Sequence, residues 1–331
     1  LVVIQRLLAL SWTWALVSAR PLASSTIGME LEFDILRIIF ADCRFLQARL
    51  GDSFPNNHLL ADRFAAWYIA TLFPEFCSQP EHDRQLAEAA LHGELQRQVL
   101  ADGSGFEHAT HYHEFGCEMV LAHFLLSRRN GRNDDATWSA ALLRRMLSFQ
   151  LDLGGPECRA AAVGNATEDP LFPLSADEGW ATGAFRETYR ALFDPTLSAA
   201  PADDRSVERA YWLLGGGLAR SQPAAAHPRY APSPHGGFYI LSDSDQGSRL
   251  VFRTGPVPGE RVMGGHMHAD LLSVTLSLRG AAILVDPGTY SYRLQAHDAQ
   301  HGADGWRAYF AGPQAHNGPS IAGVDPLGAL A

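Results

Sequence analysis

The sequence predicts an α+β multidomain protein in which an array of helices is followed by an antiparallel β-sheet. Up to about Leu218 the apolar residues recur at helical spacing, and Gly, Pro and Asn-Gly clusters mark the breaks. From Phe238 onward the pattern changes to short apolar runs separated by Gly, Asp and Pro turns. The Pro-rich stretch between them bars a continuous helix. We therefore expect a helical domain over residues 1–222, a linker over 223–237 and a β-domain over 238–331.

The individual elements follow from the spacing of their apolar residues. The helical faces carry Ile35, Ile38, Ile39 and Phe45; Leu60, Phe64, Trp67, Tyr68 and Leu72; Leu91, Leu95 and Val99; and Phe115, Met119, Ala122 and Leu126. Four strands are expected at residues 238–241, 250–253, 272–278 and 282–285, with Arg279-Gly280 as a tight hairpin between the last two. Helices of this length cannot bury their faces alone, so they must stack as a bundle, solenoid or toroid.

Composition narrows the class of partner. The chain has 331 residues, of which 47% are hydrophobic and 19% charged, as is ordinary for a globular protein. Its formal net charge of −10 argues against a nucleic-acid partner, because binding to phosphate backbones relies on clustered Lys and Arg. The four cysteines have no CxxC spacing, which favours free thiols over zinc ligands or a disulfide framework.

The N-terminal segment has two interpretations. Residues 7–17 resemble the apolar core of a signal peptide, but only Arg6 precedes them as a basic residue, and a buried helix is favoured. The segment is too short to span a bilayer, so no stable membrane insertion is expected. Because the sequence begins with Leu1 and stops at Ala331 just after a strand-like stretch, we expect a fragment of a longer chain.

The segment Gly265–Asp270 is the most informative part of the chain. If it is a strand, His266, His268 and Asp270 point to one face, because side chains repeat every two residues. Three polar groups on one face indicate a catalytic or metal site, whereas the alternative is a solvated edge strand.

Two more polar clusters lie in the helical part. Asn56 and Asn57 open a helix, and either could simply be its N-cap. Further on, helical spacing would bring His108, His111 and Tyr112 to adjoining parts of one surface, which could be a site or a solvated face.

Five motifs occur in order across the change from helix to strand. They are NNHLL at 56–60, DGSGFEHATHYH at 102–113, HMHADLLS at 266–273, VDPGTYSY at 285–292 and AHN at 315–317. In this order they resemble the heparinase II/III-like polysaccharide lyases, a group that includes oligoalginate lyases. The resemblance extends from Trp12 to Asn317. It implies an N-terminal incomplete (α/α) toroid and a C-terminal antiparallel β-sandwich, truncated here, with the active site in the cleft between them.

The resemblance also implies a reaction. Such lyases act on uronic-acid-containing polysaccharides by β-elimination: the proton on carbon 5 is removed and the 4-linked oxygen leaves. By the motif, Asn57 neutralises the uronate carboxylate with His58 beside it, and Tyr112 is the acid to the leaving oxygen and could also be the base. His266 matches the histidine that acts as the base or assists the carboxylate. A tyrosine can serve near neutral pH only if its pKa of about 10 is lowered by its surroundings.

A metal site is implied in the β-domain. The family's ligand pattern corresponds to His268, Asp286 and His316, and two imidazoles with a carboxylate suit a structural zinc ion. The alternative is that His268 and Asp286 merely pair across strands. Residues 306–317 depart from the basic and threonine-rich approach to the final HN pair that many relatives have. Residues 163–169 stand where relatives tend to have an acidic loop, and no role is assigned to them. The expected partner is an acidic polysaccharide or oligosaccharide, and the resemblance implies a periplasmic or secreted protein.

Two other functions compete with a lyase. A non-catalytic glycan-binding relative in polysaccharide assembly or export would fit the acidic net charge better. It would not need Asn57, Tyr112 and His266 together. A zinc-dependent hydrolase is disfavoured because the chain has no HExxH pattern and no glutamate base near the metal cluster.

Overall fold

The computed structural model describes residues 1–19, 26–51, 53–155, 162–166, 170–172, 174, 182–197, 204–215, 229–243, 246–255, 266–290 and 305–320. The chain divides into two compact units. The first contains Leu1–Gln98 with Leu171–Pro173, and the second contains Val99–Pro170 and Leu174–Ala331. Within the described residues, no helix combines the length and apolarity that crossing a bilayer requires.

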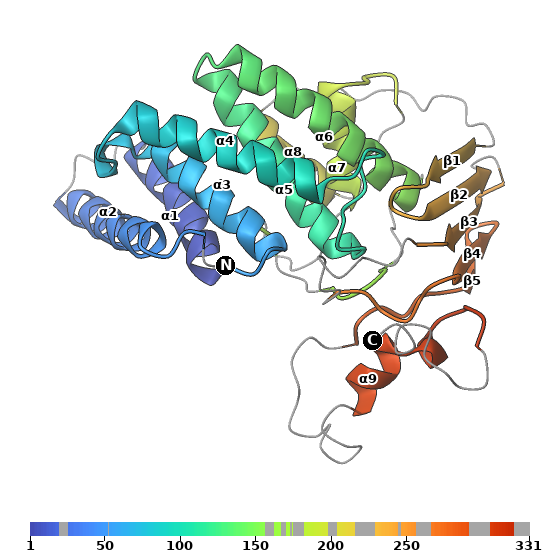
Figure 1. Cartoon of the computed structure of the whole chain (residues 1–331). Helices are drawn as coiled ribbons and strands as arrows, with labels where there is room; N and C mark the ends of the chain where they lie inside the picture. The colour runs from blue at the N-terminus through green and yellow to red at the C-terminus, as the bar shows by residue number, and fades with distance from the viewer. Residues whose placement is uncertain are drawn as a thin grey trace. The chain divides into compact units, whose positions relative to one another are not determined.

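The first unit is helical. Its elements are α1 (Val2–Ser18), α2 (Thr26–Gln47), α3 (Asn57–Leu72), the short 3-10 helix η2 (Pro74–Phe76) and α4 (Pro80–Gln98). Helix α1 packs on α2, and α3 packs on α4 (Figure 1). The apolar segment near the N-terminus forms α1 and buries Ile4, Leu7 and Leu8, which confirms the prediction of a buried helix.

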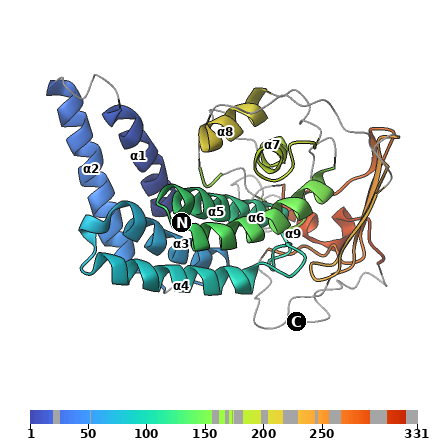
Figure 2. The same ribbon diagram turned by 90° about the horizontal axis from the view of Figure 1, so that it is seen from above.

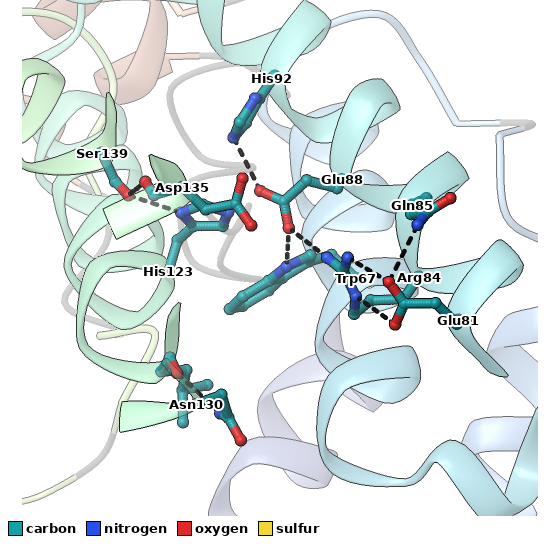
Figure 3. Close-up of polar contacts among 11 residues, drawn as sticks. Trp67, Glu81, Arg84, Gln85, Glu88, His92, His123, Asn130, Asp135 and Ser139 are labelled. Carbon is teal, nitrogen blue, oxygen red and sulfur yellow. Dashed lines mark hydrogen bonds and ion pairs between the residues drawn. The ribbon is translucent and has the colours of Figure 1, made fainter. Parts of the chain in front are cut away.

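A buried polar chain joins α3 to α4. The indole Nε1 of Trp67 donates to Glu88 Oε2 at 2.6 Å, and Arg84 Nη1 donates to the same oxygen at 3.4 Å (Figure 3). On the other side of the carboxylate, His92 Nε2 lies 2.8 Å from Glu88 Oε1. A buried carboxylate or N–H group without a hydrogen-bond partner would destabilise the fold, and these contacts satisfy each of them. This network of contacts therefore fixes how α3 and α4 pack.

The second unit begins with helices and ends with a sheet. Its helices are α5 (Thr110–Arg129), α6 (Asn133–Gly154), α7 (Thr182–Leu192), α8 (Asp204–Leu214) and α9 (Gly305–Ala311), with the 3-10 helix η4 (Pro313–Ala315). Helix α5 packs on α6, α6 packs on α7, and α7 packs on α8 (Figure 2). Asp102 ties the loop before α5 to the sheet, because its Oδ2 accepts from the backbone N–H groups of His235 at 2.8 Å and Gly236 at 3.0 Å.

The sheet is antiparallel throughout, in the order β1-β2-β3-β4-β5. Its strands are β1 (Arg229–Ser233), β2 (Phe238–Asp243), β3 (Ser248–Arg253), β4 (Val274–Leu278) and β5 (Ala281–Leu284). The end of α6 and the first three strands share one apolar core, composed of Phe149, Leu153, Val163, Ala231, Phe238, Ile240 and Val251. This core places the segment around Val163 beside the sheet.

Most of the expected elements are confirmed. Helices occupy the first part, strands occupy the expected ranges after Phe238, and Arg279 and Gly280 form the hairpin turn with positive φ. Strand β1 is the exception, because it lies inside the stretch 223–237 that the sequence assigns to a linker. The sequence pattern does not indicate this strand because Pro232 cannot donate a backbone hydrogen bond to a neighbouring strand. A proline is nevertheless tolerated in an edge strand such as β1.

The cysteines of the described residues form no disulfide. Cys43, Cys77 and Cys117 are free; Cys43 and Cys117 are buried, and Cys77 is partly exposed. Cys158 lies outside the described residues.

Candidate active site

In the first unit, the start of α3 presents Asn57. Asn56 is the N-cap, because its side chain accepts from the backbone N–H of His58 at 2.9 Å. Its carbonyl accepts from Gln98 Nε2 at 2.7 Å, which fixes the capping residue to the end of α4. Asn57 is therefore released from capping and occupies the first helical position, where it is 2% exposed, while His58 is exposed.

In the second unit, α5 begins at Thr110 after an unusual residue. His108 has φ of +55°, a left-handed conformation that few residues other than glycine adopt, and it precedes the helix. The expectation that helical spacing groups His108 with His111 and Tyr112 is therefore wrong. His111 and Tyr112 lie in the first turn with their rings edge to face at 5.2 Å. Burial lowers the pKa of His111 to about 4, aided by nearby His266, so its imidazole is neutral at pH 7.

The segment from His266 to Asp270 is not a strand. Its backbone bonds to segments that are not strands: His266 O accepts from Asn165 N at 2.7 Å, and Ala269 N donates to Ala311 O at 2.8 Å. Alternation of polar residues cannot distinguish such an extended loop from a strand, which explains the wrong prediction. The side chains are nevertheless buried, with His266 7%, His268 1% and Asp270 1% exposed. The alternative of a solvated edge is therefore wrong as well.

The structure brings Tyr112 and His266 together. Their rings stack with centroids 3.8 Å apart and an interplanar angle of 30°. Tyr112 is half-buried, and His266 Nε2 lies 3.3 Å from Glu107 Oε2, a carboxylate that is itself 7% exposed. A phenol, an imidazole and a carboxylate in contact form a group that can exchange protons with a bound substrate. Because Asn57 belongs to the other unit, its convergence with this pair stays a prediction.

Of the three predicted metal ligands, His316 lies beside both Asp286 and His268, but the ligand atoms of the three do not all lie within 4.8 Å of one another. His316 Nδ1 donates to Asp286 Oδ2 at 3.1 Å, and the rings of His268 and His316 are 5.4 Å apart. Burial lowers the pKa of His268 to about 4, with the nearby His316 adding to the effect. Burial is the largest single influence on His316 and opposes its charge, but the hydrogen bond to Asp286 and the charges of Asp286 and Asp270 together outweigh burial and raise the pKa of His316.

The chemical types of these donors, two imidazoles and a carboxylate, suit a metal ion. His268 Nδ1 and His316 Nε2 are buried and have no hydrogen-bond partner among the described residues. A buried ring nitrogen without a partner is costly, and a metal ion is one of the groups that can satisfy it. The ligand set predicted from the sequence therefore fits zinc in its chemistry.

Two residues near the site were missed by sequence reasoning. Glu107 lies in the motif at 102–113, but only the 3.3 Å between its Oε2 and His266 Nε2 shows that it belongs to the site. Asn165 lies in the stretch 163–169 that received no role, and its amide touches both histidines: Nδ2 is 3.4 Å from His266 Nδ1, and Oδ1 is 3.0 Å from His268 Nε2. The neighbouring Gly164, at φ of +70°, is the one local signal of a constrained loop.

Comparison with known proteins gives two matches to family sequence profiles. Residues 24–172 match the heparinase II/III N-terminus, and residues 225–329 match the heparinase II/III-like C-terminal domain. No curated protein matches the chain.

Solved structures share the fold. A protein described as a heparinase III gene product is 16% identical, with a TM-score of 0.65 over 98% of this chain and 45% of its own. The heparan sulfate lyase HepC from Pedobacter heparinus is 18% identical, with a TM-score of 0.58 over 95% of this chain and 44% of its own. Another heparinase III is 18% identical, with a TM-score of 0.62 over 91% of this chain and 44% of its own. The chain thus spans less than half the length of each. An incomplete toroid followed by an antiparallel sheet domain is confirmed as the fold class.

Proposed function

The chain belongs to the heparinase II/III-like family, and from that premise we propose that the protein is a carbon–oxygen lyase that cleaves a uronic-acid-containing polysaccharide by β-elimination. The observation that carries the proposal is the stacking of Tyr112 on His266 at 3.8 Å. A phenol that must gain and lose a proton needs a polar neighbour, and the ring of a buried histidine supplies one. This contact joins residues from two of the five motifs.

The first chemical requirement is to neutralise the uronate carboxylate. Removing the proton on carbon 5 places further negative charge on that group, so hydrogen-bond donors aimed at it act mainly in the transition state. In the proposal Asn57 supplies such a donor from α3, with the exposed His58 beside it. Its place at the first helical position supports this role, because the helix N-terminus favours negative charge.

The second requirement is proton transfer. Tyr112 is assigned as the acid that protonates the leaving 4-linked oxygen and as a candidate base for carbon 5. His266 is assigned to assist it. The neutral imidazole of His111 packs edge to face on Tyr112 and limits the positions that the phenol can take.

The metal is assigned a structural role. His268, Asp286 and His316 would hold a zinc ion, which when bound supplies a rigid anchor for the segment that carries His266. The two buried ring nitrogens without partners support this assignment. A lower zinc content in His268→Ala than in the parent protein would agree with it, and equal content would contradict it.

The substrate is an acidic polysaccharide or oligosaccharide. Heparan sulfate is one choice, because a solved structure of the same fold carries the name heparan sulfate lyase. Alginate is another, because the family that the sequence resembles includes oligoalginate lyases. We propose that the protein acts in the periplasm or outside the cell, where it would encounter such polymers.

The experiment is to incubate the full-length protein with a panel of acidic polysaccharides and follow the absorbance of an unsaturated uronate. Absorbance should rise for at least one polymer and should stay flat with Tyr112→Phe. Binding of a polymer by the parent protein without any rise in absorbance would favour the glycan-binding alternative instead.

A further inference from the structure

Asn165 lies between the two histidines that the site depends on. Its side-chain Nδ2 is 3.4 Å from His266 Nδ1, and its Oδ1 is 3.0 Å from His268 Nε2. Its backbone N–H also donates to the carbonyl of His266 at 2.7 Å. Asn165 is 7% exposed, so water competes little for these bonds. One residue thus makes three contacts with the segment that carries the candidate catalytic and metal-binding imidazoles.

The chemistry of an amide decides where the imidazole protons lie. The amide oxygen can only accept, so His268 must carry its hydrogen on Nε2, which leaves Nδ1 with a lone pair. The amide nitrogen can only donate, so His266 Nδ1 must be the acceptor, and a neutral His266 carries its hydrogen on Nε2. That nitrogen is the one that faces Glu107 Oε2 at 3.3 Å. His268 Nδ1, the nitrogen left with the lone pair, is buried and bonds to no other described residue.

We propose that Asn165 is a positioning residue that fixes the tautomers and ring orientations of His266 and His268 together. The consequence for catalysis rests on the proposed function. With Nδ1 accepting from Asn165 and Nε2 turned to Glu107, His266 has its ring nitrogens engaged by the protein. Proton transfer with the substrate then falls to Tyr112, whose ring stacks on His266.

The loop that carries Asn165 is held rigidly enough for this task. Val163 O accepts from Thr110 N at 3.0 Å, which links the loop to the first turn of α5. On the other side, the hydroxyl of Thr289 donates to Gly164 O at 3.2 Å and accepts from the N–H of Ala166 at 2.6 Å. The loop therefore connects α5, the histidine segment and the VDPGTY segment, and Asn165 cannot move without disturbing all three.

The test uses the imidazole nitrogens directly. In full-length protein labelled with ¹⁵N-histidine, NMR should show His266 and His268 each with its hydrogen on Nε2. Asn165→Asp keeps the size of the side chain but offers only acceptors, so hydrogen should appear on His266 Nδ1. Asn165→Ala should leave mixed tautomers at both residues. Unchanged ring-nitrogen signals for His266 and His268 in both variants would overturn the proposal.

The kinetic arm has a matched control in the same unit. Among the described residues, Asn130 makes one side-chain hydrogen bond, from Nδ2 to Leu126 O at 2.7 Å, and it is exposed at the end of α5 (Figure 3). Asn165→Ala should lower kcat by roughly 10–100-fold with a small change in KM, as for other partners that orient functional imidazoles. Asn130→Ala should leave kcat unchanged. Equal kcat in the two variants would contradict the proposal. If the parent protein cleaves no polymer, only the proposed function fails, and the NMR signals still decide the role of Asn165.

Discussion

Gly164 provides a test of how tightly the loop is packed against the candidate site. A Cβ atom at this position would lie 2.5 Å from His266 O, 2.9 Å from Ala109 Cβ and 3.0 Å from His108 O. Two of these are backbone atoms of segments that lead to the site, so neither can yield without moving it. The residue also has φ of +70°, which an L side chain adopts at a cost of about 1–2 kcal/mol.

The expected loss in Gly164→Ala is the sum of two effects. Backbone strain contributes about 1–2 kcal/mol, and forcing extra atoms into a packed region contributes about 1–3 kcal/mol. Gly131 is the matched control, because it has φ of +72° and nothing within 4 Å of its Cβ position. Gly131→Ala should therefore lose stability through backbone strain alone.

The assay is urea unfolding followed by far-UV circular dichroism, with turnover measured on the same samples. Gly164→Ala should unfold at clearly lower urea than Gly131→Ala and should lose turnover in its folded fraction, because His266 is displaced. Equal midpoints for the two variants, with normal turnover in both, would refute the packing that we describe around His266.

The remaining predictions concern individual side chains. Tyr112→Phe removes the hydroxyl that we propose transfers protons, and it should lower turnover by roughly 10²–10⁴-fold with little change in Tm; initial rates and calorimetry check the two parts. Asn57→Ala should raise the activation barrier by roughly 2.7–4 kcal/mol if the amide stabilises developing charge, whereas Asn56→Ala should cost about 1 kcal/mol of stability as a lost N-cap and leave the rate of folded protein intact. Burial raises the pKa of Glu114 to about 8. The folded state thus keeps a proton that the unfolded chain releases near its ordinary pKa of 4.5, so stability falls as pH rises from 4.5 to 8. The free energy of unfolding of Glu114→Gln should change less with pH over that range than that of the parent protein. Parallel curves of unfolding free energy against pH for the two proteins would contradict this.

The sequence predicts the order of helices and strands because burial imposes a period on each of them. The helical faces around Phe64 and Met119 and the strands after Phe238 form where their apolar spacing indicates. Strand β1 is not predicted because a proline such as Pro232 argues against most strands, although it is compatible with an edge strand. The segment at His266 is predicted as a strand but is an extended loop. Side chains alternate along both, so the sequence pattern cannot distinguish them.

The site is only partly predictable. Tyr112 and His266 could be named from their motifs, and their stacking agrees with that choice. Asn165 could not, because its importance comes from a loop fold that brings it to residues far along the chain. Its contacts with the imidazoles depend on backbone hydrogen bonds such as that from Asn165 N to His266 O. The spacing of residues in the sequence does not predict such bonds.

The central claim is that the protein breaks a glycosidic bond by elimination rather than by hydrolysis. The direct measurement is the mass of the products after digestion of the accepted acidic polysaccharide by the full-length protein. Elimination adds no water, so the new non-reducing ends should be one water lighter than hydrolysis products and should carry a double bond between carbons 4 and 5. Products with the mass of hydrolysis, from any polymer that the protein cleaves, would contradict the account.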